Sequence, residues 1–187
     1  MVSVGALWFP ILVSAAVVFV ASSVIHMFLP WHKGDFRQLP SEEAFRDAVR
    51  GVGDIPPGDY ITPYAAGMKE AGTAEFRAKY EQGPVAILTV LPNRFPSMGP
   101  RFGQWFLYCA VVGIFTAYLT GVALGPGADY RAVFRIAGTA AFMGYGLAMA
   151  QGSIWLSRRW GTTLRGMADA LVYGLLTGGV FGSMWPV

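Results

Sequence analysis

Four apolar stretches, each long enough to cross a lipid bilayer, constrain this chain more than any other feature of its sequence. They cover roughly residues 7–29, 102–124, 134–156 and 166–185. A helix of 23 residues is about 35 Å long, and the hydrocarbon core of a bilayer is about 30 Å thick. Most of the charged residues lie outside these stretches, because residues 32–101 hold 18 of the 25. The sequence therefore predicts an all-α integral membrane protein with four transmembrane helices.

The expected organisation has three parts. Residues 1–31 form the first transmembrane helix, residues 32–101 a cytoplasmic loop of about 70 residues, and residues 102–187 the other three helices. In the loop, Ser41 and Thr73 are predicted to cap short helices over residues 42–50 and 74–82. The apolar run 85–91 is either a strand, paired with residues 60–64, or a segment in the membrane interface.

Lysines and arginines near the helix ends predict how the chain is threaded. Seven fall on one side of the membrane: Lys33, Arg37, Arg94, Arg101, Arg158, Arg159 and Arg165. Only Arg131 and Arg135 fall on the other side. Because basic residues accumulate on the cytoplasmic side, we expect the large loop inside the cell and both termini outside. The basic pI of about 9.2 then reflects arginines at lipid head groups, and nucleic acid is not an expected partner.

Small residues recur every fourth position in the last three apolar stretches. One series is Cys109, Gly113, Ala117, Gly121 and Gly125; a second is Ala140, Gly144, Ala148 and Gly152; a third is Gly166, Ala170, Gly174, Gly178 and Gly182. Such a series lines one side of a helix, where another helix backbone can approach closely. We therefore expect seven glycines at helix contacts: Gly113, Gly121, Gly144, Gly152, Gly174, Gly178 and Gly182. Cys109 is predicted to be a buried packing residue.

Ionisable residues are absent from the middle of all four stretches, which argues against an ion or proton pathway. Asp169 lies near the start of the fourth stretch, and its spacing predicts an i,i+4 pair with Arg165. The remaining polar residues form no row that resembles a pathway: Thr116, Thr120, Thr139, Gln151, Ser153 and Thr177.

His26 and His32 are the only histidines. Six positions on one helix differ by about 240° of rotation, so the two rings cannot hold one iron from a common helix. His26 near the end of the first stretch is an ordinary interfacial histidine, and the alternative is a haem or pigment ligand. No cofactor is required by the sequence, and no metal-binding, phosphate-binding or nucleophile motif is present. Nothing therefore predicts an enzyme.

The segments Ile25-His26-Met27, Pro30-Trp31-His32-Lys33 and Gln104-Trp105-Phe106-Leu107-Tyr108 resemble a group of small, uncharacterised bacterial integral membrane proteins. The resemblance implies a multi-pass protein of the bacterial inner membrane and assigns no activity.

Three functions remain open at this point. The first is a non-catalytic accessory or scaffolding subunit of a larger inner-membrane complex, with a bioenergetic complex as one case, so that the bilayer and other membrane subunits are the partners. The second is a small transporter or channel. The third is a haem- or pigment-binding protein that uses His26.

Overall fold

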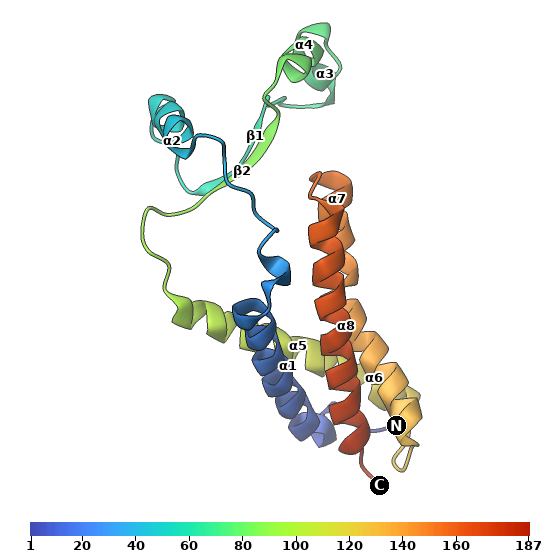
Figure 1. The fold of residues 1–187 in the computed structure, drawn as a ribbon. Coiled ribbons are helices and arrows are strands. Elements are labelled where there is room, and N and C mark those ends of the chain that lie inside the picture. The colour runs from blue at the N-terminus through green and yellow to red at the C-terminus, as the bar shows by residue number, and fades with distance from the viewer. The chain divides into compact units, whose positions relative to one another are not determined.

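The computed structural model describes residues 1–187 and divides the chain into two compact units (Figure 1). The helical unit comprises Met1–Arg37 and Ser97–Val187, and the loop unit comprises Gln38–Pro96. The predicted loop of residues 32–101 is thus shortened at both ends, because its first and last residues fold with the helices.

The helical unit contains the long helices. Its elements in chain order are η1 (Val4–Leu7), α1 (Trp8–Phe28), η2 (Pro30–His32), α5 (Met98–Ala123), α6 (Tyr130–Tyr145), η3 (Leu147–Met149), α7 (Ala150–Trp155) and α8 (Trp160–Ser183). Helix α1 packs on α5 and α8, and α6 packs on α5 and α8, so the contacts close a ring in the order α1, α5, α6, α8.

Three of these helical stretches are long and apolar enough to cross a membrane: Val4–Phe28, Met98–Ala123 and Tyr130–Trp155. The third is not one regular helix, because a 3-10 turn, η3, separates α6 from α7. The fourth predicted stretch corresponds to α8. That helix starts at Trp160, earlier than expected, and therefore includes Arg165 in addition to Asp169.

Two clusters of buried side chains form the core of the helical unit. Val18, Cys109 and Tyr145 belong to one, and Leu7 and Phe181 to the other. Cys109 is a free, buried thiol, as predicted. Large apolar side chains also cover the outside of the unit; Phe115 on α5, for example, is 65% exposed. A helical unit with an apolar exterior as well as an apolar core is suited to a bilayer.

Five of the seven predicted packing glycines lie where a side chain would collide with another segment. A Cβ on Gly174 would lie 2.8 Å from the carbonyl oxygen of Gly138, and one on Gly178 would lie 2.7 Å from that of Phe134. The other three are Gly121 against Val2, Gly144 against Val112 and Gly182 against Tyr130. The contacts of Gly174 and Gly178 allow the backbones of α6 and α8 to approach closely.

The remaining two positions are less crowded. A Cβ on Gly113 would lie 3.2 Å from the Ile11 side chain, a tight contact. One on Gly152 would meet only the Arg158 side chain at 3.8 Å, so Gly152 does not lie at a close helix contact and that prediction is wrong. The second series does not face α8. Gly138, which is outside the series, faces α8, whereas Gly144 faces α5.

One end of the helical unit joins the chain termini to the turn between α5 and α6. The Val2 amide donates to the Gly121 carbonyl at 2.8 Å, and the Gly127 amide donates to the Pro186 carbonyl at 2.8 Å. The Trp185 indole N–H donates to the Gly125 carbonyl at 2.9 Å. The N-terminus, this turn and the C-terminus therefore lie together.

The loop unit is a two-stranded hairpin with short helices. Its elements are α2 (Glu42–Gly51), β1 (Gly58–Thr62), α3 (Met68–Ala71), α4 (Ala74–Gln82) and β2 (Ala86–Val90). Helices α2 and α4 match the predicted ranges, and the Thr73 hydroxyl accepts from the Phe76 amide as the expected N-cap. Strands β1 and β2 are antiparallel, which decides between the two interpretations of residues 85–91. None of the residues of this unit is buried.

Candidate functional site

A cluster of titratable side chains lies where α1 ends against α8. Helix α1 stops at Phe28, because Leu29 is extended (φ −86°, ψ 137°) and Pro30 then starts η2. A residue before proline disfavours the helical conformation, and proline has no N–H to continue the helix. The break turns the chain back so that His32 lies beside His26.

The two imidazole rings stack on each other. Their centroids are 4.5 Å apart and their planes differ by 8°. On a continuous helix the two side chains would point about 240° apart. The break at Leu29 brings them side by side instead. Parallel stacked rings are also incompatible with axial ligation of one haem, because those ligands approach the iron from opposite faces.

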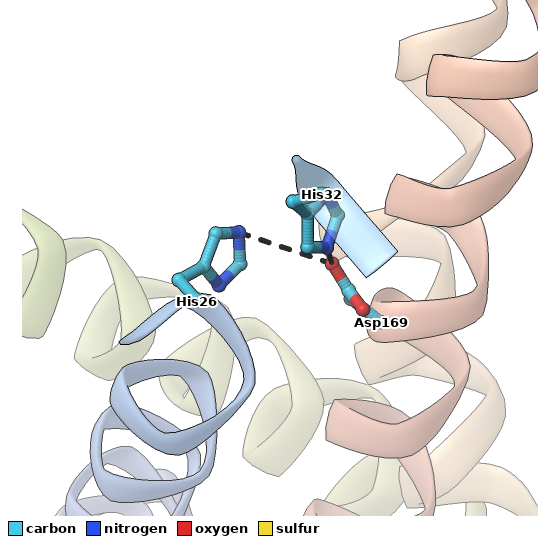
Figure 2. Close-up of side chains that lie close together, drawn as sticks. All are labelled: His26, His32 and Asp169. Carbon is cyan, nitrogen blue, oxygen red and sulfur yellow. Dashed lines mark hydrogen bonds and ion pairs between the residues drawn. The ribbon is translucent and has the colours of Figure 1, made fainter. Parts of the chain in front are cut away.

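Asp169 of α8 lies beside both histidines. Its Oδ2 is 2.8 Å from Nε2 of His32 and 3.9 Å from Nε2 of His26. Figure 2 shows the three side chains converging from α1, η2 and α8. Nε2 of each ring and a carboxylate oxygen of Asp169 all lie within 4.8 Å of one another. Two nitrogens and one oxygen therefore lie close together, and one ring would have to turn out of the stack for both nitrogens to face a single ion.

Asp35 and Arg165 form a second layer behind His32. Nδ1 of His32 lies 2.7 Å from Asp35 Oδ2, and the Arg165 guanidinium donates to Asp35 Oδ1 from two nitrogens, with Nε at 2.9 Å. Burial by itself raises the pKa of Asp35, but the hydrogen bonds and charges of His32 and Arg165 lower it to about 2. Asp35 is thus an ionised carboxylate that orients the His32 ring.

These contacts correct the expected pair between Arg165 and Asp169. Arg165 pairs with Asp35 and Asp169 pairs with His32, so each residue bonds across the fold instead of along the helix. The Arg159 guanidinium adds a bond to the Gly34 carbonyl at 3.1 Å. The segment after α1 is consequently held to α8 by three polar contacts.

Both rings have a hydrogen-bond acceptor beside Nδ1. The carbonyl of Ser22 accepts a hydrogen bond from Nδ1 of His26 at 2.9 Å, which leaves Nε2 of the neutral ring with a free lone pair. His32 has a carboxylate beside each nitrogen, Asp35 at Nδ1 and Asp169 at Nε2.

Asp169 has unused bonding capacity in this site. Asp169 is only 3% exposed, and its Oδ1 is buried without a hydrogen-bond partner. A buried carboxylate oxygen without a partner is costly, and in native proteins such a group calls for an explanation. A bound cation is one explanation, because it would use the lone pairs that the protein leaves free.

The ligand types and their outer partners fit a transition-metal ion. Metal-bound histidines donate their other N–H to a carboxylate or a backbone carbonyl, and here Asp35 and Ser22 have these roles. A tetrahedral ion with bonds of about 2.0–2.1 Å separates its ligand atoms by about 3.4 Å. The two measured distances, 2.8 Å and 3.9 Å, lie on either side of this value.

The sequence predicted only part of this cluster. His26 was a candidate ligand, but His32, Asp35 and Asp169 were not recognised as its neighbours. The signal that could have located His32 is Pro30, because a proline at this position ends the helix between the two histidines. No protein-family profile, curated protein or solved structure matches the chain, so the site is interpreted from its own geometry.

Proposed function

We propose that this protein is a membrane protein that binds a divalent transition-metal ion through His26, His32 and Asp169. One observation carries the proposal. Nε2 atoms of two imidazoles meet a buried carboxylate whose second oxygen has no partner. Both rings are already oriented by bonds at Nδ1.

The ligand set favours some ions over others. Imidazole nitrogens suit Zn²⁺, Fe²⁺, Cu²⁺ and Ni²⁺, whereas Mg²⁺ and Ca²⁺ prefer oxygen ligands. Three protein ligands leave at least one coordination position for water or another molecule, as in catalytic zinc sites and in iron sites with two histidines and one carboxylate. The proposed ligand is therefore a first-row transition-metal ion with at least one coordination position left open.

Metal binding would compete with protons for Nε2 of both rings. Asp35 would accept from Nδ1 of His32 and keep that ring oriented toward the ion. Binding is therefore accompanied by proton release and weakens as the imidazoles become protonated. The Arg165 guanidinium holds Asp35 in the orientation that this exchange needs.

The four-span threading in a bacterial inner membrane, with both termini outside, is part of this proposal. Helix α8 has 24 residues and would be about 36 Å long, sufficient for a fourth span. Arg101, Arg159 and Arg165 would then lie at the cytoplasmic interface together with the metal site. Accessibility of single cysteines introduced at residue 3 and residue 160 tests this orientation.

Membership of a larger membrane assembly stays a prediction. The apolar exterior of α1 and α5 is the feature that supports it, since the same side chains suit lipid and another transmembrane subunit. Purification in mild detergent followed by mass spectrometry tests it. A protein that migrates alone at every detergent concentration contradicts it.

Titration with Co²⁺ tests the metal site directly. The detergent-purified protein, stripped with a chelator, should develop the visible absorption of cobalt bound to nitrogen ligands, and Zn²⁺ should displace it. His32→Ala and Asp169→Asn should each weaken binding more than 100-fold, because removal of an outer partner alone typically costs 10–100-fold. Asp59→Asn, in the loop unit, is the matched control.

Two results would overturn the proposal. One is no saturable Co²⁺ or Zn²⁺ binding by a folded protein. The other is binding that survives His32→Ala. In either case the cluster would be a structural lock between η2 and α8, and His32→Ala would lower thermal stability only.

A further inference from the structure

A second site lies on the other side of His26, between the end of α1 and the start of α5. A cavity of about 660 Å³ opens there. It lies within the volume range of small-molecule pockets, about 300–1,000 Å³. Most of its wall is apolar and comes from Met27 on α1 and from Met98, Phe102 and Trp105 on α5.

Contacts between α1 and α5 form part of the wall of this cavity. The Trp105 indole N–H donates to the Ser22 hydroxyl at 2.7 Å, and the Phe19 ring packs edge-on against Phe102 with centroids 6.0 Å apart. The Ser22 hydroxyl in turn donates to the Phe19 carbonyl at 2.9 Å. The Trp105 indole and the Ser22 hydroxyl are thus bonded internally and are not free to bind a polar ligand.

Arg101 is the only charged residue in the lining. It makes no hydrogen bond or ion pair within the helical unit, whereas Arg159 and Arg165 are both bonded there. A guanidinium binds phosphate and carboxylate oxygens through a fixed fork of donors. The cavity therefore combines an apolar wall with one unpaired cation at its rim.

The apolar wall is continuous with the exposed apolar surface of both helices. Met27 is 70% exposed and Phe102 is 42% exposed, and both helices are apolar enough to cross a membrane. Methionine side chains adapt their shape to flexible chains. An occupant with a hydrocarbon chain can therefore enter from the bilayer, while its head group stays beside Arg101.

We infer that this cavity binds one anionic phospholipid, with the phosphate paired to Arg101 and an acyl chain against Met27, Phe102 and Trp105. Charge complementarity selects the anionic class, and the apolar lining selects a lipid over a free phosphate ion. The inference goes beyond the metal proposal, although His26 and Ser22 border both sites, because its anchor and its reporter, Arg101 and Trp105, are neither metal ligands nor their outer partners.

Fluorescence quenching by brominated lipids tests this inference. The protein is reconstituted in phosphatidylcholine bilayers that contain a chelator and a small fraction of phosphatidylglycerol, with bromine on the acyl chains of one lipid at a time. Trp105 lies in the wall, so brominated phosphatidylglycerol should quench more strongly than brominated phosphatidylcholine. The preference should vanish in Trp105→Phe, which keeps the other tryptophans.

Arginine variants test whether Arg101 binds the lipid phosphate. Arg101→Gln should reduce the preference for phosphatidylglycerol about fivefold, the size expected for one basic residue at an anionic interface. Arg101→Lys should retain most of it. Arg135→Gln is the matched control, because Arg135 also borders a pocket, but one of only 230 Å³.

Four outcomes overturn the inference. Equal quenching by the two lipids in the unmodified protein excludes a selective site. A preference that survives Arg101→Gln excludes this arginine as the anchor. A preference that survives Trp105→Phe places the lipid elsewhere. Inorganic phosphate that abolishes the preference at millimolar concentration would show an anion site without a role for the lipid chain.

Discussion

Asp169 of α8 lies 2.8 Å from Nε2 of His32, although 137 residues separate the two in the chain. This contact joins the segment after the first helix to the last helix of the protein. It also defines the metal proposal, because the same carboxylate oxygen is 3.9 Å from His26 and the second oxygen of Asp169 has no partner.

Asp35 supports the site from the second layer, and its removal should weaken metal binding. Asp35→Asn keeps the shape of the side chain but removes the ionised acceptor for Nδ1 of His32. We expect a 10–100-fold loss of Zn²⁺ or Co²⁺ affinity with an unchanged number of sites, measured by competitive titration. Asp47→Asn, at an exposed pair with Arg50, should have no effect. Unchanged affinity in Asp35→Asn would mean that His32 is not a ligand.

The helix break at Pro30 should be required for the site. In Pro30→Ala the backbone N–H is restored, and α1 can continue past Leu29, which would rotate His32 away from His26. We expect metal affinity to fall although Pro30 touches no ligand. Pro10→Ala, in the first turn of α1, where proline removes no helix bond, should leave the affinity as it was. Equal affinities for the two variants would show that the break is not what assembles the site.

Close packing of α6 and α8 should make Gly178 intolerant of a methyl group. In Gly178→Ala the new Cβ would lie 2.7 Å from the Phe134 carbonyl oxygen, so the two backbones must separate. A loss of about 1–3 kcal/mol is expected for such overpacking. Gly103→Ala, where nothing lies within 4 Å, should instead stabilise by up to about 1 kcal/mol through helix propensity. Thermal unfolding in detergent measures the stability of both variants. Stability changes of the same sign in both would contradict the close packing of Gly178.

Replacing a buried threonine by valine should change stability differently according to whether its hydroxyl has a hydrogen-bond partner. Thr177 is 2% exposed and its hydroxyl has no partner, so Thr177→Val should be neutral or stabilising. Thr163 is equally buried, but its hydroxyl lies 2.7 Å from that of Ser153. Thr163→Val leaves Ser153 unpaired and should cost about 1–3 kcal/mol. A greater loss for Thr177→Val would indicate a buried water or a polar partner at that position.

The sequence by itself determined the local elements. Ser41 and Thr73 stand at the starts of α2 and α4 as expected, because such start signals depend only on neighbouring residues. The predicted cap is confirmed for Thr73 alone, since the Ser41 hydroxyl makes no capping bond. The long apolar runs determined the helical unit and its suitability for a membrane, since length and composition alone decide whether a helix can cross a bilayer. Six of the seven glycines chosen from their spacing lie at close contacts, with Gly152 as the exception, because helical periodicity places such residues on one side of a helix.

Only the tertiary structure decided which of these elements meet. The rotation of α6 about its axis determined that Gly138, rather than Gly144, faces α8. On a continuous helix His32 would face away from His26. The turn after Leu29 instead places the two ring centroids 4.5 Å apart. Arg165 and Asp169 are four residues apart, which suggested a local pair, but each found a partner more than a hundred residues away. Spacing along one helix cannot determine such pairs, because their energy depends on which chain segment the rest of the fold brings alongside.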